Sequence, residues 1–494
     1  MTDTRRILPH VNPRLARRAH HTPSGPGSPP TPKAPQTSPP DIQVAYRILN
    51  FALRAGGAML SCGASTVEVE ETILGLTSAC GLAHCEADVT FTSMTASYIP
   101  SPDVQPITAV WVVRQRSVDY GQLAGINALR SDIRARRITP EQAIVRLDEI
   151  LSTPPRGQRV VLLSWAGMAT AFTILLGGGW IAGVTAFVSA ALVTLLMRVV
   201  ARHGIPYFFQ AAMGSAVATG IATGVVALHI HVQPPMVVAG GIMVLVPGYA
   251  LVASVRDAIT GFPLSGSAHG LEVLLTAAGI LTGVAVVLYP AVASGISLDL
   301  TSSYSGPIQQ VPVQVVAAGI ASCLYAVAAM VPNRSLVYSG AVGACGLAIV
   351  LLLGHVGISS EASTAVAAVL IGAAGAILGR KQRTHAFLYI VPGVMPLVPG
   401  LTLYKGMLDL FNHSNAGLGT LMHALTVGLT IAAGVTLGEL IIRPLRHPRV
   451  RHHLVRPHLA ESHPPEEHRI DPVTGPEASV GSGAEPLPAG TISP

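Results

Sequence analysis

The amino-acid sequence predicts a mainly α-helical polytopic membrane protein. We expect ten transmembrane helices, arranged as two inverted five-helix repeats and preceded by a small cytosolic α+β domain. Half of the 494 residues are hydrophobic and only 11% are charged, which is less than half the charge content of a typical soluble domain. The charges crowd into residues 1–160 and 440–494. In the apolar stretch between them, the octet GIMVLVPG at 241–248 recurs as GVMPLVPG at 393–400.

The two ends of the chain have the composition of disordered segments. Residues 1–40 are rich in Pro, Ser and Arg, and residues 447–494 are dominated by His, Pro, Glu and Gly. Such segments bury too little apolar surface to offset the conformational entropy lost on folding. We expect no secretory signal, because no apolar run follows the arginines of MTDTRRILPHVNPR at the start of the sequence.

Residues 41–152 predict the small α+β domain, which begins with two helices. Apolar residues recur at helical spacing over 41–63. The segment STVEVEETILGLTSACG at 65–81 begins with Ser65 and has Glu68 three residues later, which is the capping-box pattern of a helix N-terminus.

Two strands and two further helices complete the predicted domain. β-branched and aromatic residues indicate strands over 87–99 and 107–117, joined by the turn-forming PSPDVQP. Residues 120–137 form a basic amphipathic helix. The last helix has Thr139 as its cap and Pro140 at its first position, where proline is favoured.

The chain has five cysteines, none of which form a C-x-x-C pair, so the sequence suggests no disulfide framework and indicates a reducing compartment for the N-terminal part. The cysteines are Cys62, Cys80, Cys85, Cys323 and Cys345. The group Cys62, Cys80, His84 and Cys85 fits no standard zinc spacing, so we expect no metal and no cofactor. Most of the basic residues that produce the net charge of +6 lie beside the predicted spans, so this charge does not indicate nucleic-acid binding.

Ten apolar segments are each long enough to cross a hydrocarbon core of ~30 Å. They are residues 160–178, 181–201, 207–229, 235–255, 268–290, 312–331, 335–354, 359–379, 385–408 and 417–442. With the N-terminal domain in the cytoplasm, the inside loops and C-terminal flank hold thirteen Lys and Arg residues, whereas the outside loops hold only Lys405. The positive-inside rule therefore predicts that both termini are cytoplasmic.

The octets belong to a longer internal repeat. With the same offset of 152 residues, each of the first five spans aligns with one of the last five. One repeat covers residues 160–290 and the other covers residues 312–442. The offset also places Asp257 on Asp409 and Gly220 on Gly372. Because five is odd, the second repeat must enter the membrane upside down, which is the inverted-repeat arrangement of many secondary transporters.

Each octet lies about halfway along its span, and its proline should interrupt the helix there. Pro247-Gly248 and Pro399-Gly400 end the two octets, and Pro396 loosens the second span further. In lipid, freed backbone groups persist only where protein buries them or where they face a wet cavity. An interrupted helix offers a helix N-terminus to an anion and free carbonyls to a cation, and a zwitterionic amino acid needs both. A simple proline kink is the structural alternative.

Ionisable side chains in or beside the spans are the second set of candidates, because charges in membrane segments are costly and usually functional. Glu272 and Glu439 are the most interior acids and could bind an ammonium group or carry a proton. Asp257 and Asp409 could act as symmetric gates or form ion pairs with Arg256 and Lys405. The remaining members are His269, Glu361 and His423.

Four motifs together make the chain resemble the threonine/serine exporter family over about residues 41–445. They are LSCGASTVEVEETI at 60–73, DVTFTSMT at 88–95, RDAITGFPLSGSAHGLEVLL at 256–275 and GVMPLVPGLTLYKGM at 393–407. The resemblance implies export of L-threonine and L-serine, driven by the proton motive force. The implied pattern residues are Asp257, Thr260, Gly261, Pro263, Glu272, Pro396, Pro399, Gly400, Tyr404, Lys405 and Gly406.

We therefore interpret the chain as a proton-coupled exporter in a bacterial plasma membrane that works by alternating access and is not an enzyme. Substrate would bind near Pro247 and Pro399, and Glu272 or Glu439 would carry the proton. Its partners would be the two amino acids, protons and the lipid bilayer; a homo-oligomer stays open.

Two alternatives remain from the sequence. One is a dicarboxylate exporter on the same scaffold, which would need cations facing the cavity. The other is a membrane-anchored hydrolase with its chemistry in residues 41–152. Its candidate groups would be Ser61, Ser65, Glu68, His84 and Asp88, although no G-x-S-x-G or H-E-x-x-H motif is present.

Overall fold

The fold is described from a computed structural model of the chain. It covers residues 41–101, 104–114, 118–230, 234–246, 248–294, 311–399, 402, 405–406, 409 and 416–442. The chain divides into two compact units, Met1–Arg446 and His447–Pro494, and all of the described residues belong to the first. The segments 1–40 and 447–494, for which the sequence predicts disorder, lie outside the described residues.

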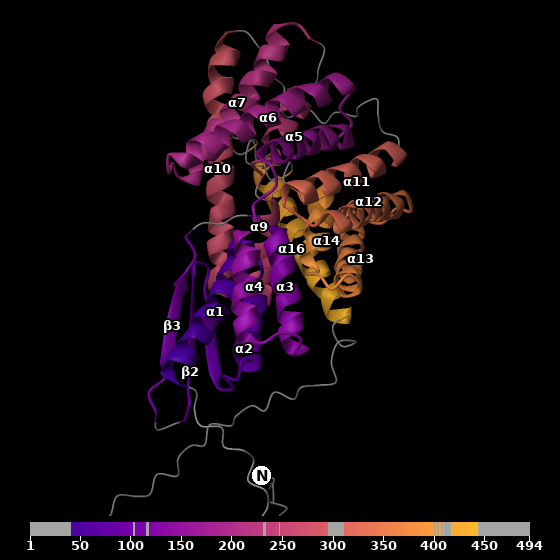
Figure 1. The fold of residues 1–494 in the computed structure, drawn as a ribbon. Coiled ribbons are helices and arrows are strands. Elements are labelled where there is room, and N and C mark those ends of the chain that lie inside the picture. The colour runs from indigo at the N-terminus through magenta and orange to yellow at the C-terminus, as the bar shows by residue number, and fades with distance from the viewer. Residues whose placement is uncertain are drawn as a thin grey trace, which may run out of the picture. The chain divides into compact units, whose positions relative to one another are not determined.

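A layer of helices on a small sheet forms the part of the chain that precedes the apolar helices (Figure 1). Its elements are α1 (Ile42–Ser61), α2 (Thr66–Ala79), β1 (Cys85–Val89), β2 (Ser93–Tyr98), β3 (Ile107–Val112), α3 (Tyr120–Arg134) and α4 (Pro140–Ser152). We call these elements the soluble unit. The described strands pair antiparallel in the order β1-β2-β3, with Ala96 opposite Ala87 on one side and Ala109 on the other. Helix α1 packs on β2 and β3, and its Gly57 leaves room for the Trp111 ring.

The predicted strand over 87–99 is wrong, because this segment folds back on itself as the hairpin of β1 and β2. Hydroxyl groups make the turn: the Thr90 Oγ1 lies 2.9 Å from Ser93 Oγ, and the Thr90 N–H donates to the Ser93 carbonyl at 2.8 Å. Such Ser and Thr turns lack the Gly or Pro that marks most turns in a sequence. The hairpin places Phe91 at its tip.

The cap predictions are confirmed in two helices. Ser65 Oγ accepts the Glu68 N–H at 3.4 Å at the start of α2. At the start of α4, Thr139 and Gln142 form a complete capping box, with Pro140 at the first helical position. In α2 the box is incomplete, because the Glu68 carboxylate turns toward the apolar helices instead.

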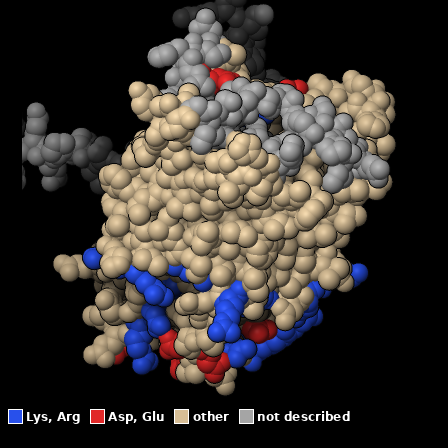
Figure 2. Space-filling model, turned by 90° about the horizontal axis from the view of Figure 1, so that it is seen from above, with Lys and Arg blue, Asp and Glu red and all other residues tan. Residues whose placement is uncertain are grey.

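Within the described residues, eight helices are long and apolar enough to cross a membrane. They are α5 (Gln158–Leu175), α6 (Trp180–Arg202), α7 (Tyr207–Ala227), α10 (Pro263–Ala293), α11 (Val311–Ala328), α12 (Asn333–His355), α13 (Ser360–Lys381) and α16 (Ala416–Ile442). They coincide with eight of the ten predicted segments. Most of the face seen in Figure 2 carries no charged side chain, and Lys and Arg side chains gather along one edge of it. The chain is therefore a helical, multi-pass membrane protein.

The other two predicted segments are built from short helices, and each is interrupted at its octet. Helix α8 (Pro234–Ile242) ends inside the first octet, and α9 (Gly248–Ile259) begins at its last residue. In the second octet, α14 (Phe387–Val394) passes into the 3-10 turn η1 (Met395–Leu397), after which Val398 is extended. The predicted helix breaks are confirmed. Pro247, Gly400 and Tyr404 lie outside the described residues.

Corresponding helices of the two halves pack in the same pairs. Helix α8 packs on α6 and α7, and α14 packs on α12 and α13. The first glycine of each octet lies at these contacts: Gly241 faces Ser189 of α6 and Ala218 of α7, and Gly393 faces Val342 of α12 and Ile371 of α13. A side chain at either position would displace its neighbours, which explains why both octets begin with glycine.

A second pair of small-residue contacts joins the outer helices. Helix α10 packs along α7, with Gly279 and Gly283 against the carbonyls of Phe208 and Ala212. Helix α16 packs along α13 with glycines at the same four-residue spacing, Gly434 and Gly438. Close backbone approach through such glycines is a common way for membrane helices to associate.

Candidate functional site

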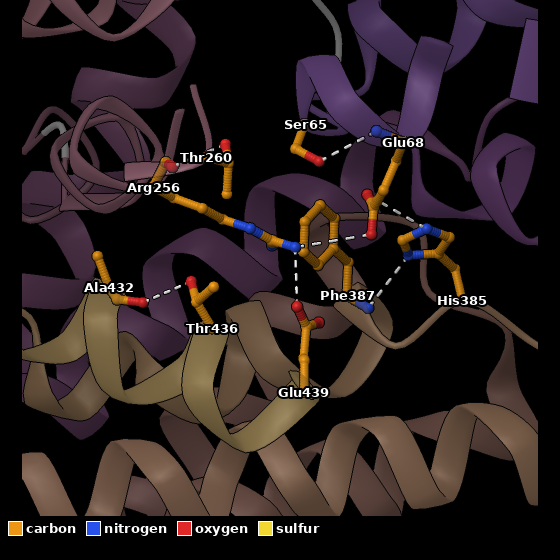
Figure 3. Close-up of polar contacts among 9 residues, drawn as sticks. All are labelled: Ser65, Glu68, Arg256, Thr260, His385, Phe387, Ala432, Thr436 and Glu439. Carbon is orange, nitrogen blue, oxygen red and sulfur yellow. Dashed lines mark hydrogen bonds and ion pairs between the residues drawn. The ribbon is translucent and has the colours of Figure 1, made fainter. Parts of the chain in front are cut away.

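The guanidinium of Arg256, at the C-terminal end of α9, is the centre of a charged cluster (Figure 3). Its Nη2 lies 2.8 Å from the Glu439 carboxylate of α16 and 3.6 Å from the Glu68 carboxylate of α2. The group also lies over the Phe387 ring, 4.4 Å from the ring centre. The Arg256 side chain is only 12% exposed, so two carboxylates and an aromatic face replace its lost hydration.

Glu68 connects this cluster to a histidine at the start of the second interrupted segment. Its Oε2 lies 3.5 Å from Nε2 of His385. The other ring nitrogen, Nδ1, accepts the Phe387 N–H at 3.2 Å. A nitrogen that accepts a hydrogen bond carries no proton, so the proton of a neutral His385 sits on Nε2 and points toward Glu68.

Glu68 is ionised at neutral pH. Burial alone would raise its pKa, but His385, Arg256 and Arg130 lower it, together with the hydrogen bond to Ser65. The net result is a pKa below the usual 4.5. The soluble unit therefore presents a fixed negative charge to the membrane helices.

A second cluster surrounds Asp257, the residue after Arg256. The carboxylate of Asp257 is almost fully buried and lies 3.7 Å from Nε2 of His269 on α10. On the other side of the ring, Nδ1 lies 3.8 Å from the Glu272 carboxylate. Phe91 of the β1–β2 hairpin packs edge-on against the same imidazole, with ring centres 4.7 Å apart. The histidine thus lies between two acids and against the Phe91 ring of the soluble unit.

A tight turn between α9 and α10 holds these two clusters together. Thr260 donates its hydroxyl to the carbonyl of Arg256 at 3.0 Å, which closes the end of α9. Gly261 has a φ of +99°, a conformation that residues with a side chain rarely adopt. Pro263 then occupies the first turn of α10, where its missing N–H costs no hydrogen bond. The sequence-predicted Thr260, Gly261 and Pro263 therefore shape the turn.

Two cavities adjoin the clusters. The larger, of about 190 Å³, lies between α2 and α3 of the soluble unit and the helices α9, α13 and α16, and Arg256, Glu68 and Glu439 are in its wall. The smaller, of about 30 Å³, is lined by Arg256, Asp257 and His269 together with apolar residues of α9, α14 and α16. Its polar wall and its size suit one water molecule.

The remaining predicted positions are more scattered. Pro396 begins the turn η1 and Pro399 is buried just after it, while Gly248 starts α9. Lys405 and Asp409 are half-buried. Glu361 pairs with His423 at 3.2 Å, and both side chains are more than 40% exposed (41% and 44%).

The hydrolase candidates do not form a catalytic arrangement. Ser61 donates to the Ala58 carbonyl at 2.8 Å within its own helix, and Ser65 is the cap of α2. His84 and Asp88 are exposed. Burial raises the pKa of the Cys62 thiol to about 11, which leaves it protonated. Among the described residues, no group of His, Cys, Asp and Glu is placed to hold a metal ion.

Sequence reasoning missed two members of the site. Glu68 was considered as a capping residue and as a hydrolase candidate, but not as a partner of an arginine on the membrane helices. His385 was not singled out, although a histidine at the start of a proline-rich apolar span is an unusual choice. Both contacts join segments far apart in the chain, which no local pattern records.

Comparison with known proteins covers most of the chain. A family model described as "Putative threonine/serine exporter" matches residues 50–289, and one described as "Threonine/Serine exporter, ThrE" matches residues 314–441. The chain is 31% identical to a "Threonine/serine exporter" of Corynebacterium glutamicum over 436 residues, covering 85% of this chain and 87% of that protein. It is also 31% identical to a "Probable threonine/serine exporter" of Mycobacterium tuberculosis over 411 residues, covering 81% of this chain and 77% of that protein. No solved structure matches.

Proposed function

Since the chain belongs to the threonine/serine exporter family, a family of transporters rather than enzymes, we propose that it exports L-threonine and L-serine from the bacterial cytoplasm, driven by the proton motive force. The observation that carries this proposal is the pair of interrupted apolar helices, one of which ends in the adjacent buried charges of Arg256 and Asp257. Interrupted helices and intramembrane charges mark substrate and ion pathways in transporters.

The proposed scaffold has ten crossings in two inverted repeats, with the segments 234–259 and 387–409 as the fourth and ninth. The matched packing of α8 on α6 and α7, and of α14 on α12 and α13, supports this arrangement. The octet glycines Gly241 and Gly393, which lie at equivalent helix contacts, support it as well. Both termini would be cytoplasmic, in keeping with the basic residues in the inside loops and the C-terminal flank.

Substrate would bind where the two octets interrupt their helices, near Pro247 and Pro399. The N-terminus of α9 at Gly248 would attract the substrate carboxylate, and backbone carbonyls around Pro396 and Pro399 would accept hydrogen bonds from its ammonium group. Gly400, Tyr404 and Lys405, which come shortly after Pro399 in the sequence, belong to the same proposed pathway. Rocking of one repeat against the other would expose this site first to the cytoplasm and then to the outside.

The two acids that the sequence puts forward as proton carriers take different roles in this proposal. Glu439 holds the Arg256 guanidinium at 2.8 Å, so we assign it to a cytoplasmic gate. Glu272 shares His269 with the buried Asp257, at 3.8 and 3.7 Å. An imidazole between two carboxylates is a suitable proton relay, because it can accept a proton on one nitrogen and release one from the other. We assign the proton pathway to these three residues.

The test is uptake of labelled L-threonine into inside-out membrane vesicles, with and without a protonophore. We expect protonophore-sensitive uptake that unlabelled serine blocks and succinate does not. Block by succinate alone would favour the dicarboxylate alternative, and no uptake by inserted protein would reject the proposal.

Matched variants test the relay. Glu272→Gln and His269→Gln should abolish gradient-driven uptake but leave threonine exchange intact, because exchange needs no net proton movement. Glu361→Gln alters another acid–histidine pair, whose histidine is 44% exposed whereas His269 is 11% exposed, and should change neither. Unchanged pH dependence in both relay variants would exclude these residues as the pathway.

A further inference from the structure

The larger cavity has the walls of a binding site for a small charged molecule. Guanidinium groups of Arg130, Arg256 and Arg380 and carboxylates of Glu68, Glu71 and Glu439 line it. Three basic and three acidic residues are thus in its wall, together with His385. A net-neutral ligand that carries both charges matches this balance, whereas a dicarboxylate would require a surplus of cations to offset its desolvation.

Acidic and basic side chains come to the wall from both the soluble unit and the membrane helices. Glu68 and Glu439 approach each other across Arg256, from α2 and α16 respectively. Arg130 of α3 donates to the hydroxyl of Thr72 at 3.1 Å and also lowers the pKa of Glu68, and Arg380 of α13 donates to the backbone carbonyl of Ile442. The cavity thus offers carboxylates for an ammonium group and guanidinium groups for a carboxylate. Hydroxyl groups of Thr72 and Thr260 are also in the wall.

The volume fits a small amino acid. About 190 Å³ exceeds the ~150 Å³ of an engineered protein cavity that binds benzene, so the space is sufficient for a single small amino acid. The position also separates this cavity from the octets. Arg256 lies near the C-terminal end of α9, eight residues after Gly248, which places the N-terminus of the helix about 12 Å away.

We propose that this cavity is a cytoplasmic loading site for a zwitterionic L-amino acid, in which the soluble unit supplies Glu68 and Arg130 and the membrane helices supply Arg256, Arg380 and Glu439. The inference rests on the proposed export function and extends it, because it makes the soluble unit part of substrate binding. The amino acid would enter between α2 and α16, loosen the contact of Arg256 with its two carboxylates, and then move toward the octets.

Uptake of labelled L-threonine by the full chain in inside-out vesicles, measured as a function of concentration, tests the loading site. Glu68→Gln and Arg130→Met should raise the KM for threonine at least tenfold and change the maximal rate less than threefold. Asn127→Phe should do the same by filling the cavity, since Asn127 is in its wall. The matched control Ala128→Phe, at the next and exposed position of α3, should leave the KM unchanged, as should Arg146→Met on the exposed face of α4.

Each outcome has a distinct meaning. A wild-type KM in Asn127→Phe, with normal uptake, would overturn the loading site and leave the export function in place. A lower maximal rate with an unchanged KM in Glu68→Gln and Arg130→Met would show that these residues only hold the soluble unit in place, which also overturns it. No threonine uptake by the wild-type chain would reject the export function and the loading site together. Gel filtration of Asn127→Phe, which alters no ion pair, separates these results from misfolding.

Discussion

Arg256 and Glu439 are 183 positions apart in the chain, yet the Arg256 Nη2 lies 2.8 Å from the Glu439 Oε2. This contact joins the end of an interrupted helix to the last long apolar helix, and Glu68 brings the soluble unit to the same guanidinium. The cytoplasmic gate of the proposed transporter and its soluble unit therefore share one cation. A change at this cation should affect the stability of the junction as well as transport.

Replacing Arg256 with Met should destabilise the protein by about 3 kcal/mol or more, because it leaves two poorly hydrated carboxylates without their cation. Combining Arg256→Met with Glu439→Gln should recover part of this loss. The control Arg54→Met breaks a pair of the soluble unit whose side chains are 33% and 54% exposed, and should cost less than ~1 kcal/mol. Chemical unfolding of the purified proteins measures all three. Equal costs for Arg256→Met and Arg54→Met would contradict a buried role for Arg256.

The stabilisation provided by Glu68 should disappear in acid. The pKa of Glu68 is lowered in the folded protein relative to 4.5. Its charge therefore stabilises the fold above pH 4.5, and this stabilisation is lost as the pH falls through the folded pKa. The difference in unfolding free energy between wild type and Glu68→Gln should be constant near pH 7 and shrink below about pH 4.5. Unfolding curves at pH 7, 5 and 4 measure it. A difference that grew on acidification would show that the folded pKa is raised instead.

Adding one methyl group should have opposite consequences at two glycines of the apolar helices. In Gly438→Ala the new Cβ would collide with the backbone carbonyl of Val369, and neither helix can move without breaking the contact of α16 with α13. At Gly220 nothing lies within 4 Å of an added Cβ, so Gly220→Ala should be tolerated and gain up to about 1 kcal/mol of helix propensity. Yield of folded protein and its unfolding temperature in detergent check both. Similar yields would mean that α13 and α16 pack less closely.

Cys62 should resist alkylation in the folded protein. Burial raises the pKa of its thiol to about 11, so very little thiolate is present at pH 7.5. Iodoacetamide at that pH should leave Cys62 unmodified unless the protein is first unfolded, as mass spectrometry of the digested protein would record. Rapid modification in the native protein would point to an accessible, activated thiol and would reopen the question of a metal or catalytic role.

The apolar pattern determined much of this protein before any tertiary contact was considered. Long uncharged runs can be stable only as membrane helices, so eight of the ten predicted segments coincide with long helices. The prolines of the octets determined where the two remaining segments are interrupted. The capping residues Ser65 and Thr139 determined where two helices begin, because their effect is local.

Local patterns failed where hydroxyl groups replaced the usual turn residues. The hairpin turn at Thr90 contains no Gly or Pro, so its two strands looked like one. That turn brings Phe91 to the His269 ring, so the unrecognised hairpin also concealed this contact.

The ionisable residues in and beside the spans were visible in the sequence, but their partners were not. Arg256 could have paired with its neighbour Asp257 or bound substrate, and only the folded chain places it between Glu68 and Glu439. Likewise, only the fold assigns His385 to Glu68 and His269 to the Asp257 and Glu272 carboxylates. The physical reason is the sequence distance over which each interaction acts. Helix breaks and membrane crossings depend on residues that are neighbours in the chain. The partner of a charge in a poorly hydrated site depends instead on which helix the tertiary packing places beside it.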